Sequence, residues 1–294
     1  MECVANLSEG RDMAAISEMA AAVRRTGARL LDIHSDCDHN RSVFTMVGNT
    51  GELEYAAVRL AHEVAARIDL RIHRGVHPRI GALDVVPFVP LCGSTMRECV
   101  DLAVWVGERI ARETSIPVFL YGHAARRPDR TALAVIRRGG VEGLAARIGR
   151  EGWVPDFGPP TLHSSAGAVA VGARPPLVAY NVCLDTMDVA LGRRIATAAR
   201  ASNGGPAGVQ ALAFFLEGRG CMQISMNLTD VAVTSVAAAF SWVSALAAAN
   251  GVRVTSSEIV GLAPRRTLIG TTAEGLRLDG RLADRILEEH LEET

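Results

Sequence analysis

Residues 29–49, RLLDIHSDCDHNRSVFTMVGN, decide the fold of this 294-residue chain. The stretch contains two strand-like runs, RLLDIHSD (29–36) and SVFTMVGN (42–49). A polar loop from Asp36 to Arg41 joins them, as in a pair of neighbouring strands. Helical patterns lie on both sides of the pair, so two strands are expected between two helices.

The flanking segments complete a unit that occurs twice. They are a strand that ends at Asn6, helices over 13–27 and 52–68, and a strand over 82–91. The predicted order is therefore β-α-β-β-α-β. The same order recurs in strand 177–184, helix 186–202, strands 209–216 and 221–228, helix 231–250 and strand 252–260. The first strand of each half carries an asparagine, Asn6 and Asn181.

This repetition predicts an α/β (α+β) protein of two ferredoxin-like βαββαβ subdomains with a ligand crevice between them. The expected domains are 1–174 and 175–294, because the composition shifts near residue 174. A helix near 95–113 and a strand at 116–122 precede the Gly/Pro/Ser-rich tract 155–176. The glycines of that tract suit either close approach to a flat ligand or an exposed linker, and the pattern leaves both open.

Composition narrows the partners to small molecules. The 31 basic and 32 acidic residues give a formal net charge of -1, which offers no electrostatic basis for binding nucleic acid or an anionic membrane,. All 31 basic residues are arginine, so no side-chain Schiff base can form,. The six cysteines are scattered, and neither a secretory leader nor a membrane span is evident,. We expect a cytoplasmic protein with reduced, mostly buried cysteines.

The stretch HRGVHPRIGALDVVPF (73–88) places ionisable side chains immediately before an apolar strand. Gly75 and Pro78 argue against a helix, which weakens a metal site formed by His73 and His77. General acid-base chemistry suits His77 better, since a histidine titrates near pH about 6.5. A solvated surface loop is the alternative. Arg79 lies close enough in sequence to lower the pKa of His77 or to bind a carboxylate.

Two other segments concentrate ionisable side chains. His34 and His39 flank Asp36 and Asp38, a grouping that can bind a divalent ion, but it lacks a zinc-type spacing and we predict no metal,. The basic loop GHAARRPDR (122–130) is interrupted by proline, and we expect it to face solvent,.

Several motifs, in order, resemble one family. They are ECVANLSEG (2–10), DHNRSVFTMVG (38–48), HPRIGALDVVPFVPL (77–91), VFLYG (118–122), WVPDFGP (153–159), AYNVCL (179–184), QISMNLTD (223–230) and SEIVGLAP (257–264). The chain thereby resembles, over nearly its whole length, glutamate formiminotransferase, which in animals is the amino-terminal part of formiminotransferase-cyclodeaminase. The resemblance implies transfer of the formimino group of N-formimino-L-glutamate to N5 of tetrahydrofolate, without the cyclodeaminase part.

The resemblance also implies roles for particular residues. His77 corresponds to the catalytic acid-base of the HPR motif, and Asn6 to a residue of the substrate site. His34, Arg41 and Arg79 are further candidates for substrate binding. The implied folate-binding segment consists of Gly158, Pro159, Pro160, Thr161, Leu162, His163, Ser164, Ser165, Ala166 and Gly167. Tetrahydrofolate is the implied co-substrate, and a homodimer is the implied assembly.

The chain departs from the animal enzymes at His34, where they carry an aspartate. Asp36 and Asp38 are nearby acids that could take its role. Leu162 and Ala166 replace bulky aromatic residues of the folate segment. Two alternatives therefore stay open: a folate-dependent transferase that uses another formyl or formimino donor, and a non-catalytic folate-binding protein.

Overall fold

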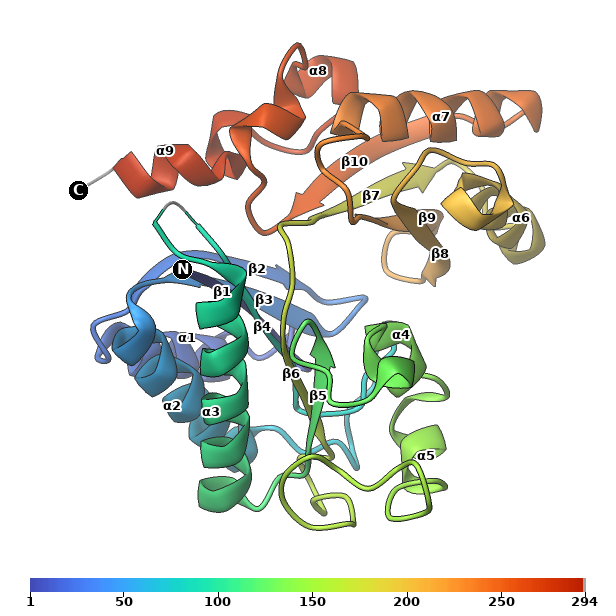
Figure 1. Cartoon of the computed structure of the whole chain (residues 1–294). Helices are drawn as coiled ribbons and strands as arrows, with labels where there is room; N and C mark the ends of the chain where they lie inside the picture. The colour runs from blue at the N-terminus through green and yellow to red at the C-terminus, as the bar shows by residue number, and fades with distance from the viewer. Residues whose placement is uncertain (92, 293–294) are drawn as a thin grey trace. The chain divides into compact units, whose positions relative to one another are not determined.

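The computed structural model describes residues 1–91 and 93–292, which form two compact units, Met1–Pro175 and Pro176–Thr294. Figure 1 shows both. Each unit contains the β-α-β-β-α-β order expected from the sequence. The mixed α/β class with two sheets is confirmed.

The first unit is built on a six-stranded sheet with the strand order β2-β3-β1-β4-β6-β5. Its strands are β1 (Glu2–Leu7), β2 (Arg29–Asp36), β3 (Arg41–Val47), β4 (Leu83–Val89), β5 (Val118–Gly122) and β6 (Val169–Ala173). Its helices are α1 (Met13–Arg24), α2 (Thr50–Arg67), α3 (Met96–Thr114), η1 (Pro128–Arg130), α4 (Leu133–Ile136) and α5 (Gly140–Ala145). β1 to β4 pair antiparallel, whereas β6 pairs parallel with both β4 and β5.

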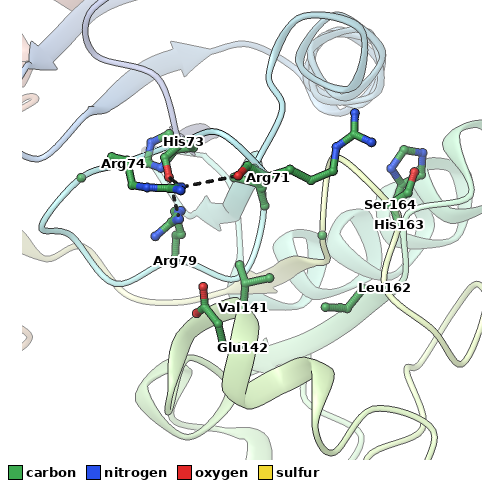
Figure 2. A pocket seen from close by; sticks show the side chains of 12 residues that line it. Arg71, His73, Arg74, Arg79, Val141, Glu142, Leu162, His163 and Ser164 are labelled. Carbon is green, nitrogen blue, oxygen red and sulfur yellow. Dashed lines mark hydrogen bonds between the residues drawn. The ribbon is translucent and has the colours of Figure 1, made fainter.

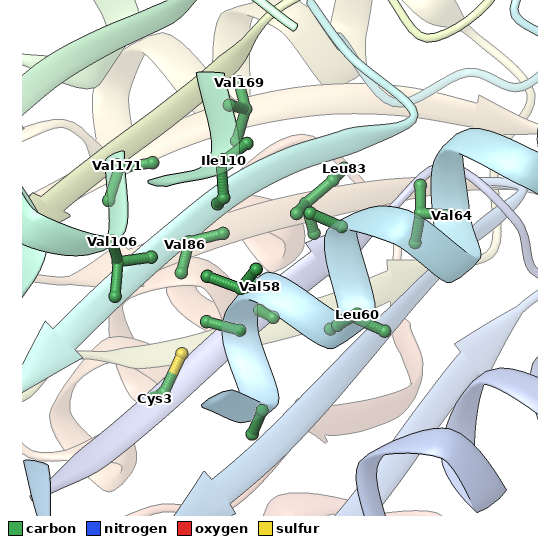
Figure 3. Close-up of a cluster of buried hydrophobic side chains, with 14 of the residues drawn as sticks. Cys3, Val58, Leu60, Val64, Leu83, Val86, Val106, Ile110, Val169 and Val171 are labelled. Carbon is green, nitrogen blue, oxygen red and sulfur yellow. The ribbon is translucent and has the colours of Figure 1, made fainter. Parts of the chain in front are cut away.

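Helices α1, α2 and α3 cover one face of this sheet (Figure 1). Sequence patterning explains their positions, because each helix has an apolar stripe and a side chain that caps its first turn,. Asn49 and Thr95 form capping boxes with Glu52 and Glu98,. The apolar stripes meet the sheet in a continuous core, part of which is drawn in Figure 3.

Strand β6 lies inside the tract 155–176, which the sequence allowed to be either an exposed linker or a ligand-binding segment. Its residues, VAVGA, are small, so its apolar and polar alternation is weak,. Small residues suit a central strand here: a Cβ on Gly172 would lie 2.6 Å from Cδ1 of Tyr121 on β5. Val169 and Val171 face the helical core, while Ala168 and Ala170 join a second cluster.

That second cluster covers the other face of β4, β6 and β5, and it corrects one expectation. The loop 122–130 was expected to face solvent, but the side chain of Arg130 is only 3% exposed. Its guanidinium lies over the rings of Phe119 and Trp153 and pairs with Asp156 at 3.2 Å. These partners come from distant parts of the chain, so the polar composition of the loop gave no sign of them.

The second unit has a four-stranded antiparallel sheet with the order β10-β7-β9-β8. Its elements are β7 (Val178–Leu184), α6 (Val189–Ala199), η2 (Ala201–Asn203), β8 (Val209–Leu216), β9 (Cys221–Leu228), α7 (Val236–Ala249), β10 (Val254–Val260), η3 (Arg265–Leu268), α8 (Ala273–Leu276), η4 (Ala283–Arg285) and α9 (Leu287–Glu292). Alternate residues of the strands pack with α6 and α7 in a separate core,. The short terminal helices α8 and α9 were not foreseen.

Four of the cysteines expected to be buried are buried, namely Cys3, Cys99, Cys183 and Cys221. Cys37 is exposed, and Cys92 lies outside the described residues. No described helix is both long enough and apolar enough to span a bilayer.

Two glycines allow the loop before β4 to meet the segment before β6. A Cβ on Gly81 would lie 1.8 Å from the carbonyl oxygen of Ala168, and one on Gly167 would lie 2.4 Å from that of Ile80. Three backbone hydrogen bonds follow from this approach: Ala82 N–H donates to Ala166 O, Ala168 N–H to Ile80 O, and Leu70 N–H to Ser165 O, at 2.8 to 2.9 Å. Glycine is required at this junction on steric grounds.

Gly81→Ala should therefore lower the free energy of unfolding by about 3 kcal/mol, because the added methyl must push two backbones apart. Urea denaturation followed by circular dichroism measures this. Gly51→Ala is the matched control, since its Cβ would meet only Asn49 Oδ1 at 3.6 Å in the first turn of α2. That variant should match the parent or exceed its stability by up to about 1 kcal/mol. Equal stability of the two variants would contradict the steric argument.

Candidate active site

The loop that carries His77 is fixed against the β2–β3 hairpin. His73 is buried, and its Nε2–H donates to the backbone oxygen of Asn40 at 2.9 Å. The side-chain amide of Asn40 in turn donates to Arg74 O at 2.9 Å. Asn40 can take this position because it is one of the few non-glycine residues with positive φ, 47°,. The sequence left His73 as an ordinary loop residue, and the structure gives it a positioning role.

His77 contacts Arg41, the first residue of β3. The guanidinium Nη1 of Arg41 donates to Nε2 of the His77 ring,. The ring of His39 lies close by, with its centroid 5.8 Å from that of His77. The sequence predicted a catalytic role for His77 and a substrate-binding role for Arg41, and the structure brings their side chains together.

The pKa of His77 is well below its usual value, first because the ring is desolvated by burial,. The positive charges of Arg41 and Arg137 lower the pKa further. Arg79, the neighbour suspected from sequence, is not among the main causes. The imidazole is therefore neutral at neutral pH, which is the form that can accept a proton.

Three of the tentative substrate residues share one face of the first sheet. Asn6 and His34 both pair with Val43 of β3, one from each side, and residues paired in this way project from the same face,. Arg41 lies two residues before Val43 on the same strand and projects likewise. The alternate residues Phe44 and Met46 pack into the helical core. Asn6, His34 and Arg41 therefore lie on the face away from α1, α2 and α3.

A cavity of about 640 Å³ opens beside the loop that carries His77. Figure 2 shows Arg74 and Arg79 on one wall and His163 and Ser164 on the opposite wall. The lining residues are Leu70, Arg71, His73, Arg74, Gly75, Arg79, Val141, Glu142, Leu162, His163, Ser164 and Gly167. His77 is not among the described residues that line the cavity, but its loop neighbours Arg74 and Arg79 are.

Arg74 and Arg79 give one wall of the cavity a positive charge, and Glu142 is the acidic side chain among the described lining residues. Arg74 and Arg79 both donate to the backbone oxygen of His73, at 2.8 and 3.3 Å. Within the described part of the chain neither forms an ion pair with a carboxylate, and the buried Nε of Arg79 has no hydrogen-bond partner. Two guanidinium groups that meet at one carbonyl favour an anionic ligand.

The predicted folate segment contributes four residues to this cavity, Leu162, His163, Ser164 and Gly167. The Nδ1 of His163 accepts the backbone N–H of Ala166 at 3.1 Å, which assigns the proton of the neutral ring to Nε2,. The backbone oxygens of Ser165 and Ala166 instead accept the N–H groups of Leu70 and Ala82. Gly158, Pro159, Pro160 and Thr161 belong to the preceding turn and do not line it among the described residues.

An ion pair between Asp84 and Arg137 supports the loop from behind. Asp84 Oδ1 accepts the backbone N–H of Ile80 at 2.8 Å, while its other oxygen pairs with Arg137. The sequence missed this pair, as it missed Arg74, because nothing in the local pattern links residue 137 to residue 84. Across residues 1–91 and 93–292 no group of three histidine, cysteine or acidic residues is arranged to hold a metal ion.

The chain belongs to the formiminotransferase family. Residues 1–174 match the model of the N-terminal subdomain of the formiminotransferase domain, and residues 179–283 match the model of the formiminotransferase domain. This agrees with the resemblance found in the sequence motifs.

Named relatives include enzymes of similar length and longer ones. The glutamate formimidoyltransferases of Streptococcus pyogenes serotype M1 and Thermoplasma acidophilum are 42% and 44% identical to this chain and align over 99% and 100% of it, and over 98% of their own lengths. The formimidoyltransferase-cyclodeaminase of Rattus norvegicus is 38% identical over 93% of this chain, which spans 52% of that protein.

The depressed pKa of His77 predicts that the protein loses stability as the pH falls. In the unfolded chain the histidine binds a proton near pH about 6.5, while in the folded chain it stays neutral to a lower pH,. Between these two values the unfolded state binds more protons, so the free energy of unfolding decreases on acidification. His73, whose pKa is also lowered mainly by burial, contributes in the same direction.

Urea denaturation of the parent and of His77→Gln at about pH 7.5 and about pH 5.5 measures the effect. The variant should lose less stability than the parent between these pH values. His123→Gln is the control, because His123 is exposed, and it should keep the parental dependence. An unchanged dependence in His77→Gln would show that the folded state does not disfavour protonation of this ring.

Proposed function

We propose that the chain transfers the formimino group of N-formimino-L-glutamate to N5 of tetrahydrofolate. The observation that carries the proposal is the similarity, over essentially the whole chain, to two proteins named glutamate formimidoyltransferase. The geometry supports it: a neutral histidine with an arginine partner lies beside a cavity lined by arginines and by the glycine-bounded segment that ends at Gly167.

The proposed reaction needs no covalent enzyme intermediate. N5 attacks the amidine carbon of the donor and forms a C–N bond, giving a tetrahedral intermediate. His77 accepts the proton that N5 loses and returns a proton to the glutamate nitrogen as its bond to the carbon breaks. The products are 5-formiminotetrahydrofolate and glutamate, so protons and bonds balance. Holding both substrates together is the larger contribution, up to about 7 to 11 kcal/mol of barrier.

Arg41 controls when His77 can accept a proton. The guanidinium of Arg41 donates to Nε2 of His77 and occupies the lone pair that a base requires,. A carboxylate is a stronger partner for a guanidinium than a neutral imidazole is. We therefore propose that a carboxylate of the donor binds Arg41, draws it away from His77 and frees the ring. Asn6 and His34, on the same face, would contact the same donor.

The cavity would receive the folate. Its glutamate carboxylates match Arg74 and Arg79, and the Nε2–H of His163 offers a further donor,. Arg79 lines the same cavity as residues 162–164, so we assign it to folate and leave the donor carboxylate to Arg41. The family resemblance supports the further proposals of a homodimer, a cytoplasmic location and domains at 1–174 and 175–294.

His77→Gln should lower kcat by about 10² to 10⁴-fold, because the amide cannot take the N5 proton. Initial-rate assays of formimino transfer measure kcat, and calorimetry with 5-formyltetrahydrofolate measures folate binding separately. Folate affinity should stay within about twofold, since the charged contacts proposed for the folate carboxylates are made by Arg74 and Arg79 and are unchanged in this variant,. His123→Gln should retain parental kcat. Near-parental turnover in His77→Gln would remove His77 from the mechanism.

Arg74→Gln and Arg79→Gln should each raise the KM for tetrahydrofolate by about tenfold or more, through loss of a charged hydrogen bond. The KM for the donor should stay within about twofold. Steady-state kinetics with each substrate varied in turn separates the two constants. Arg97→Gln, at an 84% exposed position on α3, is the charge-matched control. A selective rise in the donor KM would move these arginines to the donor site.

A further inference from the structure

The second unit has a polar cluster on the face of its sheet opposite to α6 and α7. Asn181 of β7, Gln223 of β9 and Glu258 of β10 form this cluster. The residues beside them, Tyr180, Val182, Ile224 and Ile259, pack into the core with α6 and α7. Because side chains alternate along a strand, the three polar residues project from the opposite face.

One carboxylate oxygen is the centre of this cluster. Oε1 of Glu258 accepts a hydrogen bond from the side-chain amide of Asn181 at 2.9 Å and from that of Gln223 at 3.0 Å. Both amide residues are at most 4% exposed. The guanidinium of Arg219 approaches the same oxygen at 3.9 Å, beyond hydrogen-bonding distance,. Two nearly buried amides therefore fix the direction of a charged acceptor.

The first unit has no acid at the corresponding position. The first unit has the same β-α-β-β-α-β order, and Asn6 of β1 is the counterpart of Asn181. Asn6 is paired on β4 with Val85, whereas Asn181 is paired on β10 with Glu258. The amide of Asn6 donates instead to the backbone oxygen of Val4. A carboxylate in a mostly buried position has to be held by polar partners, and those of Glu258 include Asn181, Gln223 and Arg219,.

A fixed carboxylate binds best to a planar N–C–N group that presents two parallel N–H donors. The guanidinium of Arg219, which already approaches Glu258, has this shape. Both substrates of the proposed reaction carry such a group as well. In the donor it is the formimino amidine, a strong base that is cationic at neutral pH. In the folate it is the 2-amino group and N3–H of the pterin ring.

We infer that Glu258, held by Asn181 and Gln223, binds a planar N–C–N group of one of the two substrates. This inference rests on the proposed function, because that function supplies the ligands. It assigns a binding role in the second unit to Glu258, which lies in the motif SEIVGLAP (257–264) but received no role from the sequence. An amidine held in this way stays protonated and electrophilic, whereas a pterin held in this way has its ring plane fixed.

Calorimetric titration of the full chain and of Glu258→Gln tests the inference without turnover. The probes are N-formimino-L-glutamate and 5-formyltetrahydrofolate, each titrated alone. Their matched partners are N-acetyl-L-glutamate, which keeps both carboxylates but has no amidine, and p-aminobenzoyl-L-glutamate, which lacks the pterin. Glu258→Gln should weaken one N–C–N ligand by about tenfold or more and leave its matched partner unchanged.

A selective loss of formiminoglutamate binding identifies the amidine as the group, and a selective loss of 5-formyltetrahydrofolate binding identifies the pterin. Glu217→Gln, an exposed acid in the neighbouring turn, carries the same charge change and should bind as the parent does. Equal binding by Glu258→Gln, equal weakening of all four ligands, or no binding of either probe by the parent would overturn the inference.

Melting temperature reports whether Glu258→Gln is folded, which we expect because the new amide oxygen can accept from Asn181 and Gln223. If it unfolds, Glu258→Asp, which retracts the charge by one methylene, has to show the same ligand-selective loss. Binding is measured apart from catalysis. A parent that binds both ligands but transfers nothing would therefore refute the proposed function and leave this inference standing.

Discussion

The close approach of two backbones at Gly81 and Gly167 is the constraint on which the first unit depends. It joins the loop that carries His77 to the segment that ends at Gly167, through hydrogen bonds that only glycine allows at this distance,. The cavity lies between these two segments, and the parallel pairing of β4 with β6 continues from the same junction. Site and sheet therefore share one steric requirement.

His77 connects two groups of polar residues. Its ring contacts Arg41, which belongs with Asn6 and His34 to the helix-free face of the sheet. Its loop neighbours Arg74 and Arg79 form the positive wall of the cavity. A proton carrier between two substrates has to meet both, and this is the arrangement that the proposed transfer requires. Arg41 and Arg137 help to keep the ring of His77 neutral, and in the proposed mechanism the lone pair of Nε2 becomes available once the donor binds Arg41.

Much of the fold and part of the candidate site could be predicted from the sequence, and the predictions that failed did so for physical reasons. The β-α-β-β-α-β order was visible because its strands and helices alternate apolar and polar residues with clear periods. Strand β6 gave a weak signal, since a central strand packed against Tyr121 needs small residues that also suit a loop. Arg130 was wrongly placed in solvent, because its aromatic and carboxylate partners are distant in sequence. His77 and the folate segment came from the family resemblance, whereas the support of the loop by Asp84 and Arg137 depends on tertiary contacts that no local pattern encodes.

The proposed folate site lies at the junction of the His77 loop with the segment 158–167. A crystal structure of the chain with bound 5-formyltetrahydrofolate tests it most directly. We expect the glutamate carboxylates of the folate to contact Arg74 and Arg79 and the pterin ring to extend toward His77. A folate bound away from the cavity, with both arginines unliganded, would contradict it.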